Sequence, residues 1–186
     1  MEIYLIRHTK PKVDEGVCYG QSDLPLFETF EEEWACLKRK LPDHFDIVYT
    51  SPLQRCRKLA ELIRTDSLRT DPHLMEVNFG DWELKKWDEI NAEHLQAWMD
   101  DYVNVRPPNG EAYTELYKRS TGVLNTILNT DKKTIAVVSH GGTIRAMIAD
   151  ILSLPLQKAF NLSFDYGRVS LVSISDNLKT VKYLNL

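Results

Sequence analysis

Residues 134–142 of the chain read TIAVVSHGG, and this stretch indicates the fold class most clearly. Its apolar and largely β-branched run, Ile135–Val138, predicts a buried parallel strand over residues 134–139. A Gly-Gly turn and a helix over residues 143–153 are expected directly after it. A buried strand followed at once by a helix is typical of parallel sheets that are covered by helices.

The same order of strand, polar residues and helix occurs twice more in the chain. Residues 2–7, EIYLIR, predict a second apolar strand, which ends before His8. Residues 46–50, DIVYT, predict a third, and Ser51 is placed to cap a helix that begins at Pro52. Alternating strands and helices indicate an α/β layered fold. The other elements expected are helices over 29–41, 87–103 and 111–129 and a closing hairpin of strands 168–175 and 179–185 around Ser175, Asp176 and Asn177.

The composition is that of an ordinary globular chain and excludes several classes of protein. The length of 186 residues, 43% of them hydrophobic and 27% charged, favours one domain over 1–186. With 23 basic against 27 acidic residues the net charge is −4, which argues against a nucleic-acid partner. No apolar run could span a bilayer and the first residues lack a signal-peptide pattern, so we expect a cytoplasmic protein without membrane contact.

The three cysteines, Cys18, Cys36 and Cys56, are an odd number without a CxxC pair. An odd set cannot form a complete disulfide framework, so we expect reduced thiols that serve packing. Because no cysteines or histidines have zinc-finger spacing, we expect no metal site.

Histidines and arginines follow the predicted strands at the point where each strand ends. Arg7 and His8 end the first strand, Arg55 follows the second and His140 ends the third. Because ligands of open α/β sheets bind outside the carboxyl ends of the strands, these side chains are expected to converge. Guanidinium groups match phosphate geometry, helix starts favour anions, and Gly141 lets a ligand approach the backbone. The sequence therefore predicts a phosphate pocket.

Phosphoryl transfer also needs a nucleophile and a proton donor. Histidine can act as the nucleophile, and Glu76, within MEVNFGDWE, is the best candidate for the acid. Each residue alone has an ordinary explanation, because a lone histidine at a strand end is usually structural and a lone glutamate is usually a surface acid. The ordered combination is what indicates a function.

Five segments carry a resemblance to a known family: LIRHTKP, YTSPLQRCRKLAE, EVNFGDWE, PPNGEAY and VVSHGG. In this order, over about residues 3–145, they resemble the motifs of the histidine phosphatase superfamily, in its phosphoglycerate-mutase-like branch. The resemblance implies a three-layer α/β/α sandwich with a mostly parallel mixed sheet. Within the superfamily, GVCYGQSDLPL and the short acid loop are most similar to the α-ribazole phosphatases of cobalamin biosynthesis.

The resemblance implies a phosphomonoesterase without a metal ion or cofactor. His8 would attack phosphorus and become a phosphohistidine, while Arg7, Arg55 and His140 would hold the phosphoryl oxygens. Glu76 would protonate the leaving group and then activate water. The implied partner is a small phosphorylated metabolite, α-ribazole 5′-phosphate. A broad-specificity phosphatase, a phosphoglycerate mutase and a non-catalytic phosphate-binding protein stay open, as does a homodimer.

The loop after His8 departs from the family pattern. Thr9 replaces the usual glycine, and the asparagine expected about six positions after the nucleophile is absent, with Asp14 nearest to its place. We do not transfer that asparagine's role to Asp14, because a carboxylate facing phosphate is unfavourable. The loop up to Asp23 is also about one residue short.

Substrate selection is expected from a cap over about residues 78–110 and from the loop before it. Trp82 could stack on a ring of the leaving group, and Tyr19 and Gln21 are the candidates in the loop. Trp87, Trp98 and Tyr102 could also stack on such a ring, although aromatic stripes of this kind usually form core.

Overall fold

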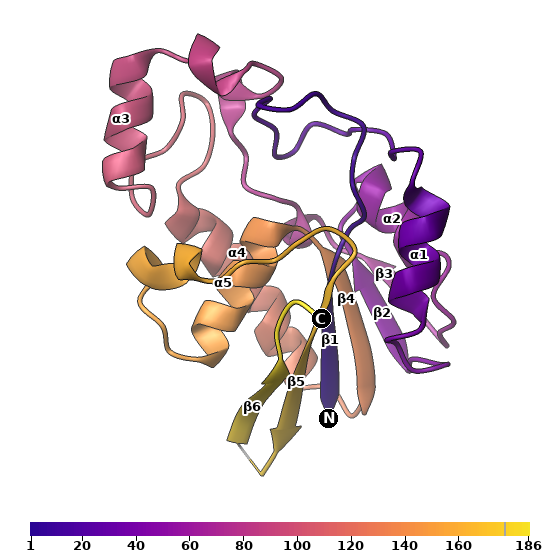
Figure 1. Ribbon diagram of the computed structural model, residues 1–186. Helices are drawn as coiled ribbons and strands as arrows, with labels where there is room; N and C mark the ends of the chain where they lie inside the picture. The colour runs from indigo at the N-terminus through magenta and orange to yellow at the C-terminus, as the bar shows by residue number, and fades with distance from the viewer. Residues whose placement is uncertain (177) are drawn as a thin grey trace.

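The computed structural model describes residues 1–176 and 178–186, and within them one mixed sheet forms the centre of the fold (Figure 1). The strand order is β3-β2-β4-β1-β5-β6. The first four strands of that order run parallel, whereas β5 pairs in the antiparallel sense with both of its neighbours, β1 and β6. The strands are β1 (Glu2–Arg7), β2 (Ile47–Thr50), β3 (Leu68–Thr70), β4 (Thr134–Ser139), β5 (Val169–Ser175) and β6 (Leu178–Tyr183).

The register of the sheet brings three of the predicted site segments to one edge. Arg7 of β1 pairs with Ser139 of β4, and Thr50 of β2 pairs with Val138. The parallel strands therefore end level with one another, and the residues that follow them meet at the same edge. This edge faces the segment that carries α3 (Figure 1).

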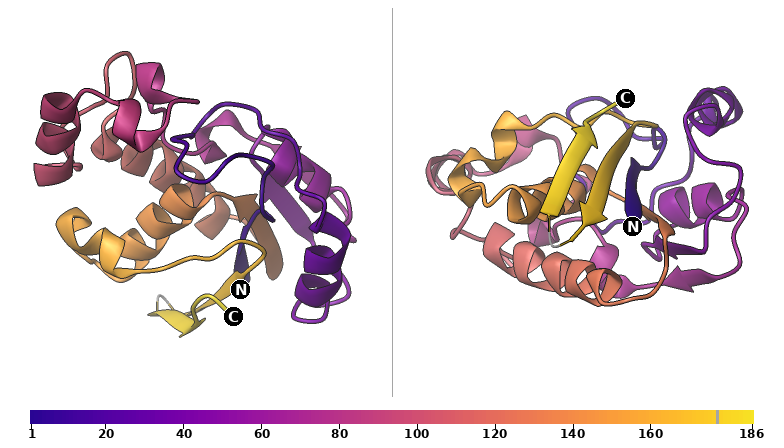
Figure 2. Two further views of the ribbon diagram at one scale, coloured as in Figure 1. Left: turned by 45° about the horizontal axis from the view of Figure 1, so that its top comes forward. Right: turned by 90° about the horizontal axis from the view of Figure 1, so that it is seen from below.

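Two helical layers cover the sheet, so the predicted three-layer α/β/α sandwich with a mostly parallel mixed sheet is confirmed. Helices α4 (Tyr113–Leu128) and α5 (Gly141–Ile151) lie on one side, and α1 (Phe30–Lys38) and α2 (Gln54–Ala60) on the other (Figures 1 and 2). Side chains alternate between the two faces of the strands, because the pleat has a period of two. Leu5 of β1, for example, packs toward α5, whereas Ile6 packs toward α2.

The segment expected to form a cap packs around a small aromatic core of its own, beside the loop that follows β1 (Figure 2). The predicted helix over 87–103 is wrong in extent. Residues Trp87–Glu89 form a 3-10 turn, and α3 spans only Ala92–Asp100. The helix begins there because the Asn91 side chain accepts hydrogen bonds from the backbone N–H groups of the first turn.

The start of α2 also differs from the prediction, because Ser51 does not cap it as expected. The helix begins at Gln54, whose backbone N–H donates to Asp23 Oδ1 at 2.7 Å. The Ser51 hydroxyl accepts from the Leu53 backbone N–H at 3.4 Å, just before the helix begins, and also lies 2.8 Å from His140 Nε2. The first N–H group of the helix is thus bound by a distant loop, and Ser51 contacts both the turn before the helix and the site.

Two further expectations need correction. Gly141 and Gly142 are not a turn but the first residues of α5, with His140 at its N-cap. Strand β3 was not predicted, because its three residues are all exposed and show no apolar alternation. The closing hairpin is present as β5 and β6, and the part of its predicted turn at Asn177 lies outside the described residues.

Two of the three cysteines serve packing as the sequence predicts, whereas Cys36 is exposed. Cys18 and Cys56 are buried in the apolar clusters of the cap and of the sheet, and all three thiols are free. Burial raises the pKa of the Cys18 thiol to about 12. In the part of the chain that the structure describes, no helix is both long and apolar enough to cross a membrane.

Candidate active site

His8 lies at the end of β1 with its side chain fully buried. Its Nδ1 is 2.6 Å from the backbone carbonyl oxygen of Thr9. A carbonyl can only accept, so Nδ1 carries the proton and Nε2 keeps a free lone pair. Burial lowers the pKa of His8 well below its ordinary value, and the positive charges of Arg55 and Arg7 lower it further. The site therefore holds a neutral imidazole whose Nε2 is available as a nucleophile.

His140 faces His8 from the N-cap of α5, with 5.0 Å between the ring centroids. Burial lowers the pKa of His140 as well, with further contributions from Arg55, His8 and Arg7. Its Nε2 contacts the hydroxyl of Ser51, as described above, and lies 3.4 Å from the Cys56 thiol. This second imidazole is therefore neutral too.

Arg7 and Arg55 bring two positive charges to the histidines. Arg55 is completely buried and donates to the backbone carbonyls of Gly20 and Ser22, whereas Arg7 donates to that of Phe164. The Nε atom of each arginine is buried and has no hydrogen-bond partner among the described residues. No carboxylate in the described chain forms an ion pair with either guanidinium. Because buried charges are costly when unpaired, this arrangement favours binding of an anion. We call Arg7, His8, Arg55 and His140 the strand-end cluster.

Two tyrosines lie over the arginines of the strand-end cluster. The Arg7 guanidinium is 3.8 Å from the ring centroid of Tyr166, and that of Arg55 is 5.6 Å from the ring of Tyr19. The two phenol hydroxyls are hydrogen-bonded to each other. Tyr166 was not predicted from the sequence. Because β5 is antiparallel, the residues just before it lie at the same edge as the ends of the parallel strands, and this topology could have identified Tyr166.

Glu76 is held against the start of α5. Its Oε2 accepts from the Gly142 backbone N–H at 2.8 Å, and its Oε1 accepts from that of Val77 at 2.9 Å. A Cβ atom at residue 142 would lie 2.3 Å from Oε1, so a side chain here would displace the Glu76 carboxylate from this position. Gly141, in turn, leaves room for Arg7, because a Cβ there would lie 3.3 Å from the guanidinium carbon.

The backbone around Glu76 is fixed by side chains from three other elements. Arg119 of α4 donates to the carbonyls of residues 73, 75 and 76 and forms an ion pair with Glu111 at 2.6 Å. Thr143 of α5 donates to the carbonyl of residue 75, and Ser139 to that of residue 74. Arg119 was not predicted, since the carbonyls that it binds around Glu76 are more than forty residues away in the chain. The carboxylate is therefore placed in advance of any ligand.

A cavity of about 530 Å³ opens beside the cluster and Glu76. Arg7, His8 and Glu76 line one part of it. The rest, which we call the aromatic cavity, is lined mainly by apolar and aromatic side chains, namely Val17, Tyr19, Val77, Phe79, Trp87, Leu95, Trp98, Met99, Tyr102, Tyr113 and Phe160, together with Gly142 and Arg145.

The three candidates for substrate contact have different outcomes. Tyr19 lines the cavity. Trp82 does not, since its side chain is 4% exposed and packs in the core of the cap. Gln21 is outside the lining too, since its amide donates to the backbone carbonyl of Glu76 and so helps to hold the acid loop.

The departures from the family pattern are accommodated locally. Thr9 is completely buried, and its carbonyl is the acceptor that orients His8. Its hydroxyl has no partner among the residues that the structure describes. Asp14 is not among the residues that line the cavity.

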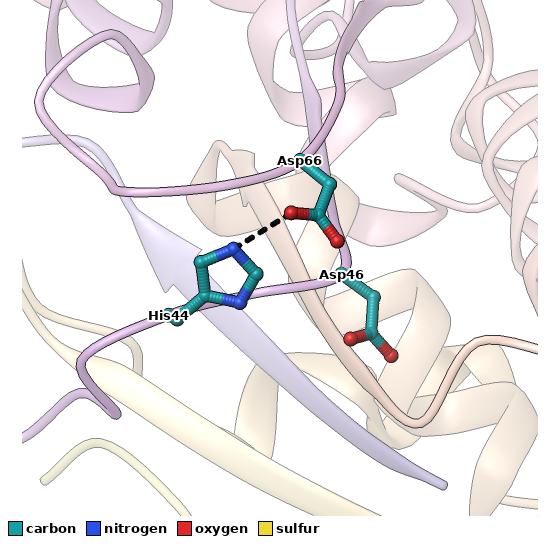
Figure 3. Close-up of side chains that lie close together, drawn as sticks. All are labelled: His44, Asp46 and Asp66. Carbon is teal, nitrogen blue, oxygen red and sulfur yellow. Dashed lines mark hydrogen bonds and ion pairs between the residues drawn. The ribbon is translucent and has the colours of Figure 1, made fainter.

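One group of side chains could hold a metal ion by proximity alone: His44, Asp46 and Asp66, whose ligand atoms lie within 4.8 Å of one another (Figure 3). His44 Nε2 is hydrogen-bonded to Asp66 Oδ1 at 2.9 Å, and Asp46 accepts from the backbone N–H groups of Lys133 and Thr134. Asp46 directly precedes β2, so the group lies at the opposite end of the sheet from the strand-end cluster. These contacts tie loops together and require no ion.

A model of the histidine phosphatase superfamily (branch 1) matches residues 3–186 of the chain. The chain belongs to the histidine phosphatase superfamily. Two curated relatives are an adenosylcobalamin/alpha-ribazole phosphatase of Escherichia coli (strain K12) and a phosphoserine phosphatase 1 of Hydrogenobacter thermophilus. They are 28% and 24% identical, over 100% of this chain and 96% and 92% of their own lengths.

The structure is similar to the crystal structure of the alpha-ribazole phosphatase from Shigella flexneri. The TM-score is 0.92 at 28% identity, over 100% of this chain and 96% of that one. Because these members of the histidine phosphatase superfamily are phosphatases, the predicted enzyme class is confirmed at the level of the family.

Proposed function

We propose that this histidine phosphatase hydrolyses phosphomonoesters through a phosphohistidine on His8. The observation that carries the proposal is the 2.6 Å contact between His8 Nδ1 and the Thr9 carbonyl oxygen, from which we infer that Nδ1 is protonated and that Nε2 is free. Burial and two arginines keep this imidazole neutral, as an attacking nitrogen must be.

In the first step, His8 Nε2 forms a bond to phosphorus while the bond from phosphorus to the leaving oxygen breaks. Arg7 and Arg55 neutralise the charge on the phosphoryl oxygens, and His140 donates to one of them once the bound anion favours its protonation. Glu76 gives its proton to the leaving oxygen, so that a neutral alcohol departs.

In the second step, Glu76 acts as a base. It takes a proton from a water molecule, whose oxygen forms a bond to phosphorus as the bond to His8 breaks. His8 is restored with its lone pair on Nε2, and the protein releases inorganic phosphate. The ordered acid loop favours this exchange of roles, since Glu76 keeps one position throughout.

The proposal needs no metal ion, because the two guanidinium groups can supply the positive charge that a phosphoryl group requires. We expect phosphatase activity to be unchanged by dialysis against EDTA. A loss of activity that added Mg²⁺ or Zn²⁺ restores would contradict this part of the proposal.

We propose α-ribazole 5′-phosphate as the physiological substrate. The aromatic cavity supports this choice, because its volume and lining suit a flat ring system attached to the phosphorylated sugar. The relatives of this chain support it as well, since several are named for this ester. In this proposal residues 78–110 are the cap that selects the leaving group.

The test compares kcat/KM for α-ribazole 5′-phosphate, phosphoserine, 3-phosphoglycerate, a sugar phosphate and a nucleoside monophosphate. We expect α-ribazole 5′-phosphate to lead by at least about tenfold. A flat profile would indicate a broad-specificity phosphatase, and transfer of phosphate between phosphoglycerate oxygens would indicate a mutase. Binding of phosphate without turnover of any ester would contradict the enzymatic proposal as a whole.

A further inference from the structure

Arg145 is the second arginine that lines the cavity, beside Arg7, and neither the motifs nor the proposed mechanism uses it. It lies on α5, three residues after Gly142, whose backbone N–H holds Glu76. A helix rises about 1.5 Å per residue, so Arg145 begins about 4.5 Å farther along α5 than the anchor of Glu76. This places it beside the part of the cavity that a leaving group would fill.

The guanidinium of Arg145 is oriented but not neutralised. Its carbon lies 4.4 Å from the ring centroid of Phe160, and its Nε donates to the backbone carbonyl of Leu162 at 3.1 Å. Within the described residues it forms no ion pair, and neither terminal nitrogen has a hydrogen bond. The stacking and the single bond fix the plane of the group and leave the donors of two nitrogens available.

The other charged side chains around the cavity indicate what the free donors of Arg145 could bind. Arg7, Glu76 and Arg145 are the charged side chains that line it. Arg7 belongs to the strand-end cluster, and Glu76 is held by two backbone N–H groups. Arg145 is therefore, among the described residues, a charged side chain of the aromatic cavity that has neither an ion pair nor a role in phosphate binding. Beside apolar walls a hydrogen bond to a guanidinium is stronger than in water.

We propose that Arg145 is a specificity-determining residue that binds a hydrogen-bond acceptor on a ring-bearing leaving group. The proposal rests on the phosphatase function above and adds the chemical class of substrate. The preferred ester has a flat ring within the aromatic walls and, on the side away from the ester oxygen, a carbonyl, carboxylate or ring nitrogen that accepts from Arg145. Arg145 is half-buried, so an ester whose ring lacks such an acceptor covers two guanidinium donors from water without replacing their hydrogen bonds, and it is disfavoured.

A purely structural role for Arg145 makes a different prediction. If the residue only ties α5 to residues 160–162, its removal should lower stability and affect every substrate to the same degree. The test must therefore measure discrimination between substrates rather than activity alone.

The experiment uses three aryl phosphates that differ only at the para position of the ring. para-Carboxyphenyl phosphate and para-carbamoylphenyl phosphate carry an acceptor, and para-methylphenyl phosphate does not. The kcat/KM ratio of each acceptor ester to the methyl ester is measured for wild type, Arg145→Met and Arg145→Lys. Comparison of ratios between variants removes the effect of leaving-group acidity, because that effect is common to all proteins tested.

We expect Arg145→Met to lower both ratios about tenfold relative to wild type, mainly through KM. Arg145→Lys, which keeps the charge, should retain part of the carboxylate preference. Arg57→Met is the matched control, because this arginine is 50% exposed on α2 and should leave the ratios unchanged.

Equal losses on all three esters, or unchanged ratios in Arg145→Met, would overturn the proposal. If Arg145→Met does not fold, as a thermal melt would reveal, the ratios of Arg145→Lys decide, and unchanged ratios for both acceptor esters overturn the proposal too. Failure of wild type to release phosphate from any ester would instead contradict the phosphatase function, so the two failures are distinguishable.

Discussion

The strand-end cluster and the aromatic cavity lie side by side but differ in burial and in chemistry. His8, Arg55 and His140 are at most 1% exposed and are fixed by strand ends, a helix start and hydrogen bonds to backbone carbonyls. In the cavity, by contrast, Met99 and Phe160 are more than half exposed. Most of the cavity wall comes from the cap and from 3-10 segments rather than from the sheet.

In the proposed function the two regions therefore serve different steps, the strand-end cluster in phosphoryl transfer and the aromatic cavity in recognition of the leaving group. Phosphoryl transfer requires charges placed in advance, and a buried cluster at the edge of a sheet can hold them without reorganisation. Recognition of a leaving group requires shape, which aromatic side chains on a separate segment can supply and vary. Substitutions in the cluster should therefore affect all substrates, whereas those in the cavity should change the order of preference.

The largest effect on kcat/KM is expected from Glu76→Gln, because this residue lies between the two regions. The amide cannot donate a carboxyl proton, so kcat/KM for an alkyl phosphate should fall by about 10² to 10⁴-fold. para-Nitrophenolate departs without protonation, so the rate of the first step with para-nitrophenyl phosphate should be nearly unchanged. Its release should then appear as a burst before the slow second step. Steady-state and stopped-flow assays with the two esters test this, and an equal loss on both would contradict the assignment of the acid.

The buried histidines of the cluster predict a pH dependence of stability. Their pKa values are lowered in the folded protein, whereas the unfolded chain takes up protons near the ordinary value of 6.5. Their contribution is thus fully present above pH 6.5 and is lost as the pH falls. Two such groups contribute a slope of up to about 2.7 kcal/mol per pH unit below that value.

Urea unfolding between pH 7.5 and pH 5 measures this slope. His8→Gln should reduce it by about half of the histidine contribution, whereas His94→Gln, at an exposed position on α3, should not. Identical slopes for these two variants would show that His8 is not held neutral.

The smallest effect is expected on the cavity side. Trp98 lines the cavity and stacks on Trp87, with 6.1 Å between the ring centroids. Trp98→Leu should lower kcat/KM for α-ribazole 5′-phosphate about tenfold and that for methyl phosphate much less, because methyl phosphate does not reach the ring. Equal changes for both esters would remove the distinction between the two regions.

Much of the fold could be predicted because the strands of the sheet are continuous apolar runs. The observed bounds of β1 and β4 are those predicted, and the polar residues after them fall where the sheet ends. Gly141 and Gly142 were misassigned because glycine favours turns in general, whereas here its missing side chain makes room for Arg7 and Glu76.

The residues that could not be predicted act through long-range contacts. Arg119 binds carbonyls that have no sequence signature, and Tyr166 depends on the antiparallel direction of β5. The local sequence around Ser51 is typical of a helix cap. In the structure, however, the first N–H group of the helix donates to Asp23 from a distant loop, and Ser51 contacts His140. The pattern of residue types thus predicts the reacting groups, and the topology determines what holds them.

The most direct test of the account is to identify the phosphorylated residue. Glu76→Gln is mixed with radiolabelled para-nitrophenyl phosphate, quenched in alkali and digested, because this variant should form the intermediate and hydrolyse it slowly. The account predicts nearly stoichiometric, acid-labile label on His8 and none in the Glu76→Gln, His8→Asn double variant. A burst of nitrophenolate without labelled protein, or label on another residue, would contradict it.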